Sequence, residues 1–244
     1  MNIQLDKPLY QANIADCDIC KEHTAWMVNG TIQQPCPSCS KKIANEDIRQ
    51  QVLKSRIADY KSIMDKKYID ADWKIFNKGV REQIHCARSC KTWSESFQVG
   101  NWLLMRGNQG TGKTLIKNLI IKDFGISRKC TMKATTGITI YNKYLDVIRG
   151  NDSLSELVSY YASVDLLIID ELGKHGIADG FKNFLNDVID NFYVNNKSLI
   201  VISNSPLKRI NEDSYKYVSD FIDVDRINEK ALQVEFNYES YRGK

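Results

Sequence analysis

The chain has 244 residues, enough for one α/β domain of ordinary size together with a small additional domain. Apolar residues make up 43% and charged residues 26% of it, without a signal-peptide pattern or a run of roughly 18 apolar residues, so we expect a cytoplasmic protein that does not enter a membrane. The net charge of +4 is too small to predict nucleic-acid binding by itself, so any basic surface must arise from local placement.

The N-terminal segment contains two closely spaced cysteine pairs. Cys17 and Cys20 form one C-x-x-C pair, Cys36 and Cys39 form the second, and fifteen residues separate the pairs. This spacing is typical of one tetrahedral Zn²⁺ site, and the lack of a secretory signal argues against a disulfide framework. We therefore predict that residues 1–40 form a zinc-ribbon-like domain that needs its metal to fold. Unrelated free cysteines, or a redox-active pair, are the alternatives.

A charged segment with apolar residues at helical spacing follows, from residue 41 to residue 67. Leu53, Ile57, Tyr60 and Met64 recur at intervals of four, three and four residues, which predicts an amphipathic helix. Because the segment contains neither Gly nor Pro, we interpret it as a linker helix that connects two domains or offers its apolar face to a partner. Packing against its own domain is the alternative.

Residues 68–244 alternate between strand-like and helix-like patterns, which predicts an α/β domain with a parallel sheet flanked by helices. Cys86 and Cys90 lie four residues apart in this domain, and helical packing explains them better than a second metal site, because no second pair accompanies them. The predicted strands cover residues 102–105, 129–134, 166–169 and 199–203, and the predicted helices follow residue 114, lie within 138–161 and lie near 181–194.

A stretch of eight residues, 107–114, follows the first of these strands and fits the G-x-x-x-x-G-K-[ST] pattern of a phosphate-binding loop. Glycines let the backbone curl so that successive N–H groups point into one cavity, and the N-terminus of the following helix attracts anions. Lys113 can then reach the outer phosphates of a nucleoside triphosphate, and the Thr114 hydroxyl can ligate Mg²⁺. The predicted loop consists of Gly107, Asn108, Gln109, Gly110, Thr111, Gly112, Lys113 and Thr114.

Two carboxylates directly follow the apolar strand 166–169. At the carboxyl end of a parallel strand, where α/β sheets bind ligands, Asp170 is expected to hold Mg²⁺ through water and Glu171 to polarise the water that attacks the γ-phosphate. Asn204 follows the next strand, and we expect its amide to help hold that water beside Glu171. An exposed acidic turn, and an asparagine that starts a turn before Pro206 for local reasons, are the alternatives.

Residues 170–173 also fit the D-x-x-G element of GTP-binding proteins. Those proteins normally carry an N-K-x-D sequence whose carboxylate pairs with guanine. The nearest candidate, Asn196 to Leu199, has leucine in place of the required acid. ATP is therefore the predicted nucleotide.

Together these motifs resemble the AAA+ ATPases, and the C-terminal sequence is similar to that of DnaC-type helicase loaders and their IstB relatives. The resemblance extends from about Ala71 to Arg242, and the cysteine-rich N-terminus is similar to that of loaders with a helicase-binding zinc domain. It implies an AAA+ P-loop fold for the second domain. The C-terminal residues that carry it are Asp225-Arg226, Val234-Glu235-Phe236 and Ser240-Tyr241-Arg242.

The resemblance implies roles for two arginines. Arg226 matches the arginine that reaches the γ-phosphate held by a neighbouring subunit, so the ATPase domains are expected to self-associate. Arg242 matches the arginine that senses nucleotide within its own subunit; both guanidinium groups offset triphosphate charge. An ordinary surface salt bridge is the alternative for each. Asp190 to Tyr193 lack the basic residue that many relatives carry near this point.

The resemblance also implies a path for single-stranded DNA along residues 138–161, where aromatic rings stack on bases and cations contact phosphates. Packing of the tyrosines in the core is the alternative. The candidate DNA-contacting residues are Tyr141, Lys143, Tyr144 and Arg149.

The function that the resemblance implies is ATP-dependent loading of a DnaB-type hexameric replicative helicase onto single-stranded DNA in replication initiation, with the helicase bound by the N-terminal domain and helix. An IstB-like transposition helper that assembles on duplex DNA is the first alternative. A zinc-ribbon adaptor that binds nucleotide without turnover is the second. The cysteine pairs favour the loader, since a different N-terminal extension is expected in the helper.

Overall fold

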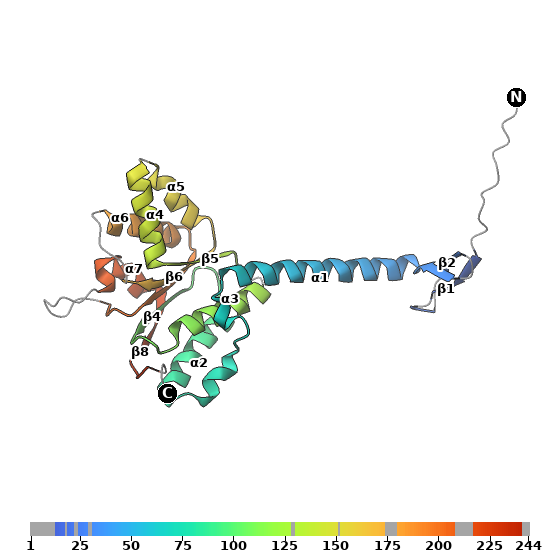
Figure 1. The fold of residues 1–244 in the computed structure, drawn as a ribbon, viewed down its shortest axis with the longest axis horizontal. Helices are drawn as coiled ribbons and strands as arrows, with labels where there is room; N and C mark the ends of the chain where they lie inside the picture. Colours follow the sequence, from blue (N-terminus) through green and yellow to red (C-terminus); the bar gives the residue numbers. More distant parts are fainter. Residues whose placement is uncertain are drawn as a thin grey trace, which may run out of the picture. The chain divides into compact units, whose positions relative to one another are not determined.

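The computed structural model divides the chain into two compact units, Met1–Arg56 and Ile57–Lys244 (Figure 1). Within the described part of the chain, no helix is long and apolar enough to cross a membrane. The structure describes residues 13–17, 19–21, 24–28, 31–127, 130–150, 152–173, 180–207 and 217–240.

The first unit contains a small antiparallel sheet of β1 (Asn13–Asp16), β2 (Thr24–Val28) and β3 (Thr31–Gln34), in the order β1-β2-β3. Helix α1 (Pro37–Ile63) begins inside the second cysteine pair, four residues earlier than the predicted start of the helix at residue 41. Pro37 suits this first helical position because its missing N–H has no partner there in any helix.

The apolar stripe predicted for this helix is used mainly by the second unit. Tyr60 and Met64 are buried in a core of that unit, and Ile57 packs against it, whereas Leu53 is exposed. A Cβ on Gly125 would lie 2.4 Å from the Tyr60 Cβ, so only glycine lets the ring approach this closely. The last turns of α1 therefore pack against the second unit, as in the alternative to a partner surface.

The second unit is built on five parallel strands: β4 (Trp102–Gly107), β5 (Met132–Thr136), β6 (Leu166–Leu172), β7 (Ser198–Ser203) and β8 (Ala231–Phe236). Their order is β5-β6-β7-β4-β8, with every neighbouring pair parallel. After β4 the chain crosses to β5 at one edge of the sheet. It later returns to form β8, which pairs with β4 on the side away from β7. Ligands of open α/β sheets bind at such a switch in strand order, beyond the carboxyl ends of the strands.

Helices cover both faces of this sheet, as expected where parallel strands are apolar on both sides. Side chains alternate across a strand, so Leu104 joins the core beneath one set of helices while Leu103 and Met105 join the other. One face carries α4 (Gly137–Gly150), α5 (Leu154–Ala162), α6 (Phe181–Val194) and α7 (Val224–Lys230); the other carries α2 (Arg81–Glu95), α3 (Lys113–Ser127) and the end of α1.

Short 3₁₀ segments join these elements: η1 (Lys66–Tyr68), η2 (Trp73–Lys78) and η3 (Val218–Asp220). Cys86 and Cys90 are buried in the core beneath α2, so the interpretation as packing residues is confirmed.

The strand predicted for residues 129–134 is displaced: β5 runs from Met132 to Thr136, and Lys129 lies outside the described residues. The displacement has a local cause. The Thr131 N–H and hydroxyl donate to the Asp165 carboxylate at 2.9 and 2.7 Å, so this N–H is bonded to a side chain, whereas the N–H of a strand residue would donate to the neighbouring backbone.

Candidate functional site

The phosphate loop lies between β4 and α3, and its glycines adopt conformations that other residues rarely take. Gly107 and Gly112 have φ angles of 126° and 97°. A Cβ on Gly107 would lie 2.5 Å from the Phe236 carbonyl oxygen, so this position also needs glycine for lack of space. The curl ends at Lys113, the first residue of α3, which places a helix N-terminus directly behind the loop.

The strand β8 and the residues after it support the loop from behind. The Asn108 N–H donates to the Phe236 carbonyl at 2.9 Å, and the Asn108 amide donates to the Tyr238 carbonyl at 3.2 Å. The buried Tyr238 hydroxyl donates to the Thr111 carbonyl at 2.7 Å. Sequence reasoning missed Tyr238, because nothing local to either segment indicates a contact across 127 residues.

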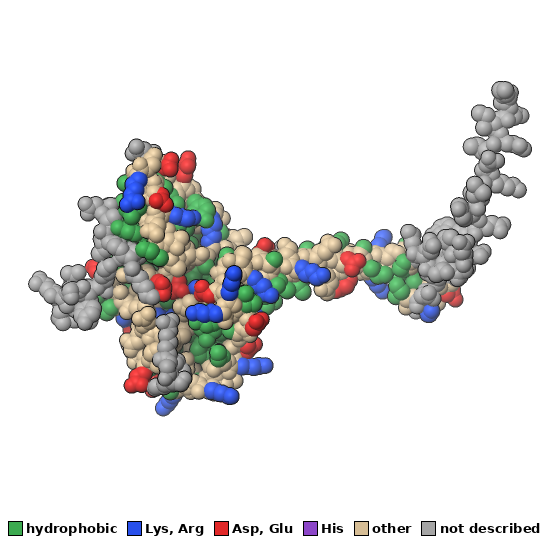
Figure 2. Space-filling model, in the orientation of Figure 1, with side chains coloured by type: hydrophobic (Ala, Val, Ile, Leu, Met, Phe, Trp, Pro, Cys, Tyr) green, Lys and Arg blue, Asp and Glu red, His purple; other side chains and the backbone are tan. Residues whose placement is uncertain are grey.

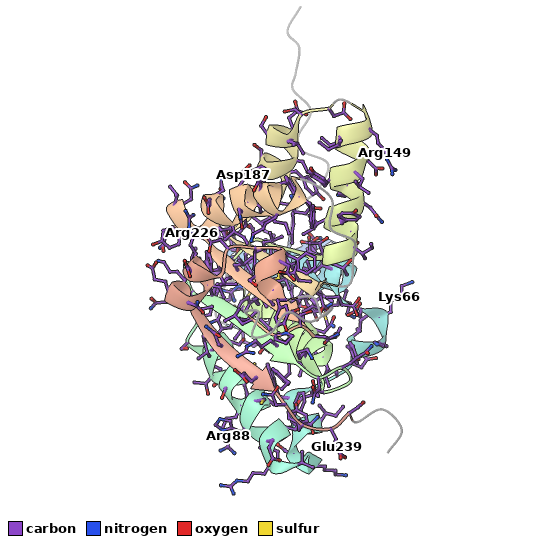
Figure 3. All side chains as sticks on the ribbon, turned by 90° about the vertical axis from the view of Figure 1, so that its left-hand side faces the viewer. Lys66, Arg88, Arg149, Asp187, Arg226 and Glu239 are labelled. Atoms are coloured by element: carbon purple, nitrogen blue, oxygen red, sulfur yellow. The ribbon has the colours of Figure 1, made fainter. Side chains whose placement is uncertain are left out.

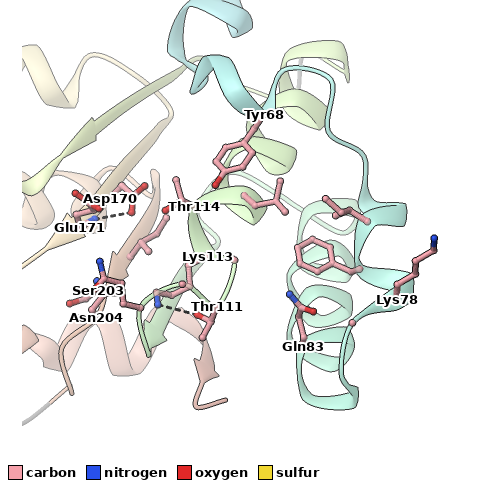
Figure 4. Close-up of a pocket in the computed structure, with 18 residues that line it drawn as sticks. Tyr68, Lys78, Gln83, Thr111, Lys113, Thr114, Asp170, Glu171, Ser203 and Asn204 are labelled. Atoms are coloured by element: carbon pink, nitrogen blue, oxygen red, sulfur yellow. Dashed lines mark hydrogen bonds between the residues drawn. The ribbon is translucent and has the colours of Figure 1, made fainter. Parts of the chain in front are cut away.

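A cavity of about 340 Å³ opens above the loop. It is lined by the loop from Gln109 to Thr114 and by three of the residues predicted from other strands, Asp170, Glu171 and Asn204. The structure therefore brings together four predicted side chains, those of Lys113, Asp170, Glu171 and Asn204. The first and the last of them are 91 residues apart in the sequence. In Figure 4, Asp170, Glu171, Ser203 and Asn204 lie on one side, Gln83 and Lys78 on the other, and Lys113 and Thr111 between them.

Lys113 is held against the loop by backbone carbonyls. Its Nζ donates to the carbonyls of Gly107 and Asn108 at 2.8 and 2.6 Å, and contacts the Thr111 hydroxyl at 3.3 Å. The side chain is 5% exposed, so its ammonium is largely shielded from solvent within a ring of oxygens. A charge held in this way interacts strongly with phosphate oxygens that enter the same cavity.

The acidic pair owes its geometry to an irregularity in β6. Successive residues of a strand normally point to opposite faces, yet Asp170 and Glu171 both line the cavity. The pairing register of β6 with β7 shifts between Ile169 and Leu172, and Glu171 has a φ of 56°. The Glu171 N–H donates to Asp170 Oδ1 at 2.8 Å. A left-handed residue other than glycine is costly, and such strain is concentrated at functional sites.

Behind Asp170 lies a lysine that sequence reasoning missed. Lys117 Nζ is 3.0 Å from Asp170 Oδ2 and 2.9 Å from Asp65 Oδ2. Burial opposes the charge of Lys117, but the two carboxylates outweigh it and raise the pKa of the ammonium above its usual value. A signal was present: Lys117 lies one helical turn after Lys113, and therefore on the same face of the predicted helix.

The wall opposite the acidic pair comes from the segment before the sheet, and sequence reasoning missed it as well. Tyr68, Ile75, Phe76 and Gln83 line it. The Phe76 ring packs beside the loop, since a Cβ on Gly112 would lie 3.5 Å from it. An apolar wall with one amide can pack against a nucleobase and hydrogen-bond to its edge.

Arg226, the predicted trans-acting arginine, does not line this cavity. It lies on α7, where its guanidinium pairs with Asp190 of α6 and lies 4.8 Å from the centre of the Tyr193 ring. Figure 3 shows Arg226 on the opposite side of the unit from Lys66. Arg242, the second predicted arginine, lies outside the described residues.

The DNA candidates on α4 differ in accessibility. Tyr144 is buried and packs edge-on against Phe181 at 5.3 Å between ring centres, so core packing, the alternative, holds for this ring. Arg149 is exposed at the end of α4, and Lys143 Nζ lies 4.3 Å from the centre of the half-exposed Tyr160 ring. On the face drawn in Figure 2, basic and acidic side chains are interspersed without a broad area of one sign.

The four cysteines of the first unit converge on one point. Their Sγ atoms all lie within 4.8 Å of one another, and those of Cys20 and Cys36 are 3.7 Å apart. A tetrahedral Zn²⁺ with bonds of ~2.3 Å separates its sulfur ligands by ~3.8 Å, so the cluster fits this ion. The four thiols are free of disulfide bonds.

Backbone groups tune these thiols. The Cys36 N–H donates to Cys17 Sγ at 3.4 Å, which lowers the pKa of the Cys17 thiol. Burial, together with hydrogen bonds to the other thiols, raises the pKa of Cys39 to about 12.

Comparison with known proteins gives a family match over most of the chain. A family model described as "IstB-like ATP binding protein" matches residues 39–244. The replicative helicase loader DnaC of Escherichia coli (strain K12) is 25% identical over 166 residues, which are 66% of this chain and 65% of that protein. The chain thus spans slightly less than two thirds of this relative's length.

Two solved structures have a similar fold. The crystal structure of the DnaC helicase loader has a TM-score of 0.53 and 19% identity, over 70% of this chain and 99% of that chain. The replication initiator DnaA bound to AMPPCP and single-stranded DNA has a TM-score of 0.56 and 18% identity, over 72% of this chain and 51% of that chain. The predicted fold class, a parallel AAA+ P-loop sheet flanked by helices and preceded by a small cysteine-bearing domain, is confirmed.

Proposed function

Because the chain belongs to the family of IstB-like ATP-binding proteins, we propose that it is an ATPase that loads a hexameric replicative helicase onto single-stranded DNA. The observation that carries the proposal is the juxtaposition, around one cavity, of the phosphate loop with Asp170, Glu171 and Asn204. A cation and a helix N-terminus face two carboxylates there, which is the charge pattern that a triphosphate and its Mg²⁺ require.

Each side chain has a role in the proposed hydrolysis. Lys113 binds the outer phosphate oxygens, and the hydroxyl of Thr114 with the carboxylate of Asp170 holds Mg²⁺, which offsets phosphate charge when it is bound. Glu171 orients and polarises the attacking water and Asn204 holds it from the side. The left-handed backbone of Glu171 supports this assignment, since it turns the carboxylate towards the cavity that Asp170 lines.

The base would lie against Tyr68, Ile75 and Phe76, with the Gln83 amide at its edge. Adenine is the proposed base, because the nearest candidate for an N-K-x-D sequence, Asn196 to Leu199, lacks the acid that pairs with guanine.

The N-terminal unit is proposed as the helicase-binding part. Cys17, Cys20, Cys36 and Cys39 would hold a structural Zn²⁺, which supplies folding free energy to a sheet of three short strands. The similarity to a replicative helicase loader supports this client, and the similar fold of DnaA, which was solved with single-stranded DNA, supports DNA as a ligand. The path of the DNA is proposed to run along α4. Lys143 and Arg149 are its proposed phosphate contacts.

Arg226 and Arg242 are proposed to sense the γ-phosphate, Arg226 from a neighbouring copy and Arg242 within its own chain. The presence of the γ-phosphate would then favour a self-associated state that grips DNA, and its loss would favour release.

A helicase-loading assay tests the proposal. The protein, the replicative helicase of the same organism and circular single-stranded DNA are mixed with ATP, and loaded helicase is separated from free helicase by gel filtration. We expect loading with the native chain and at least a tenfold loss with Lys113→Ala, because removing hydrogen bonds to charged phosphate groups costs about 1.5–3 kcal/mol. Equal loading by the two proteins would contradict the mechanism.

The transposition helper is separated from the loader by its partner. In a pull-down with the chain as bait, we expect the replicative helicase and not a transposase to be retained, and deletion of residues 1–66 should abolish retention. Retention of the transposase instead would assign the helper function. A complete lack of ATP hydrolysis, with and without single-stranded DNA, would favour the adaptor.

A further inference from the structure

Lys117 forms a bridge between two carboxylates directly behind the nucleotide cavity. Its side chain is 7% exposed, that of Asp170 is 4% exposed and that of Asp65 is 43% exposed. The ammonium contacts Asp170 Oδ2 at 3.0 Å and Asp65 Oδ2 at 2.9 Å. Lys117 does not itself line the cavity, so it acts on a ligand there through its charge, from behind Asp170.

Asp65 is fixed in this bridge by a second residue of α3. The Asn118 amide donates to Asp65 Oδ2 at 2.8 Å, and the Asp65 N–H donates to Asn118 Oδ1 at 2.8 Å. The same amide also donates to the Thr114 carbonyl at 2.7 Å. Asp65 therefore keeps a fixed distance from the start of α3.

The charge balance of the bridge is uneven. One ammonium serves two carboxylates, so Asp170 is only partly neutralised, and the share that it receives depends on Asp65. Because the Lys117 and Asp170 side chains are buried, little solvent screens these charges and they interact strongly. A divalent cation at Asp170 meets an attractive carboxylate and, behind it, a repulsive ammonium.

We propose that Lys117 and Asp65 are positioning residues that set the affinity of the cavity for the divalent cation of ATP, with Lys117 lowering this affinity and Asp65 raising it. The inference rests on the proposed ATP site. Asp65 lies two residues after the end of α1, so the bridge joins the proposed metal-binding carboxylate to the segment that follows this helix.

The two residues are expected to shift metal affinity in opposite directions. Lys117→Met removes the repulsive charge, so the Mg²⁺ concentration needed for half-maximal binding of ATP falls, by roughly tenfold. Asp65→Asn gives the whole ammonium to Asp170, so the Mg²⁺ requirement rises, by roughly threefold, since this carboxylate is more distant and half-exposed. Lys117→Arg keeps the charge and stays close to the native requirement.

Binding of a fluorescent, non-hydrolysable ATP analogue to the full chain, titrated with Mg²⁺, measures this requirement without turnover. Lys122→Met is the matched control, because Lys122 is a lysine of the same helix whose Nζ donates to the backbone carbonyls of Ile69 and Ala71. It should leave the Mg²⁺ requirement unchanged. Asp65→Asn alters a half-exposed side chain, so it keeps the test valid even if Lys117→Met fails to fold.

Opposite shifts in the two variants support the inference. A rise in both, or no shift in Asp65→Asn, overturns it, because a merely structural bridge would weaken binding whichever partner is removed. If the native chain binds the analogue with Mg²⁺ but the variants have the same Mg²⁺ requirement as the native chain, the inference falls while the proposed ATP site stands. If the native chain does not bind the analogue at all, both fall.

Discussion

Asp170 and Glu171 are neighbours in sequence but depend on different parts of the fold. Asp170 is a buried strand residue whose two oxygens accept from Lys117 and from the Glu171 N–H. Glu171 reaches the same cavity through the left-handed turn of the chain at its own position. The proposed division of labour, a fixed metal-binding carboxylate beside one that polarises water, follows from this difference.

Glu171→Gln tests that division. The amide keeps the size of the side chain but cannot take a proton from water, so the rate of ATP hydrolysis is expected to fall at least ~100-fold. The affinity for ATP should change by less than about threefold, because an uncharged neighbour of the triphosphate does not weaken its binding. Turnover in the presence of single-stranded DNA and equilibrium ATP binding are measured on the same preparation; undiminished turnover would remove Glu171 from the mechanism.

At this scale, what the sequence predicts is the local chemistry. The loop from Gly107 to Thr114 and the acidic pair are short patterns whose residue types alone indicate phosphate and Mg²⁺ binding. The structure brings them together around one cavity. Lys117 and Tyr238 were missed because their roles exist only after folding, in contacts to Asp65 and Thr111 that cross 52 and 127 residues.

At the scale of elements, the carboxylate of Asp165 connects the starts of β5 and β6 through its hydrogen bonds with Thr131. Hydrogen bonds from the Thr131 N–H and hydroxyl lower the pKa of Asp165 below its ordinary value of 3.8. A carboxyl group whose pKa is lower in the folded state stabilises the fold at pH values above its unfolded pKa, and this contribution is lost as the pH falls through the folded pKa.

Asp165→Asn is therefore expected to reduce the free energy of unfolding by about 1 kcal/mol at pH 7, a value kept small by solvent screening. The difference from the native chain should fade as the pH falls below about 4. Urea unfolding at pH 7 and at pH 3 measures it, with Asp146→Asn on the exposed side of α4 as control. A difference that grows on acidification would contradict the assignment.

The N-terminal unit, with its proposed zinc site, gives a second prediction at this scale. Cys20→Ser removes one of four proposed ligands, so the chain should lose its bound zinc, measured as one ion per native chain by native mass spectrometry. Binding of the helicase should be lost with it, whereas ATP affinity should remain, since the nucleotide cavity belongs to the other unit. Cys130→Ser, a cysteine outside the cluster, is the matched control and should keep its zinc.

Element boundaries were less predictable than element types. Helix α6 runs from Phe181 to Val194, as its periodicity predicts, because an apolar stripe alone determines it. The predicted start of β5 was wrong because the Thr131 N–H donates to the side chain of Asp165, which lies 34 residues later, just before β6. The sequence did not decide what the apolar stripe of α1 packs against, because Gly125, which leaves room for the Tyr60 ring, lies far along the chain.

For the whole molecule, assembly depends on whether Arg226 changes partners. In the single chain its guanidinium pairs with Asp190 of α6. The proposed trans role requires Arg226 to leave this carboxylate for a neighbour's phosphate, so the ion pair and the assembled state compete.

Mixing two inactive variants tests the trans role. Lys113→Ala supplies Arg226 but no working loop, and Arg226→Ala supplies the loop but no arginine, so each alone should hydrolyse ATP at less than about a tenth of the native rate. An equal mixture should regain roughly a quarter of the native rate, because about one interface in four pairs both intact parts. Arg88→Ala, an exposed arginine of α2, is the control. A mixture no more active than its components would leave Arg226 a structural residue.

The central claim, that a triphosphate and its Mg²⁺ lie between the phosphate loop and the acidic pair, is tested most directly by calorimetric titration of the chain with ATP and Mg²⁺. The account predicts one ATP per chain, with an affinity that falls roughly 10- to 100-fold in Lys113→Ala, since hydrogen bonds to charged groups are worth about 1.5–3 kcal/mol. Equal affinity of the two proteins for ATP, or no binding by either, would contradict it.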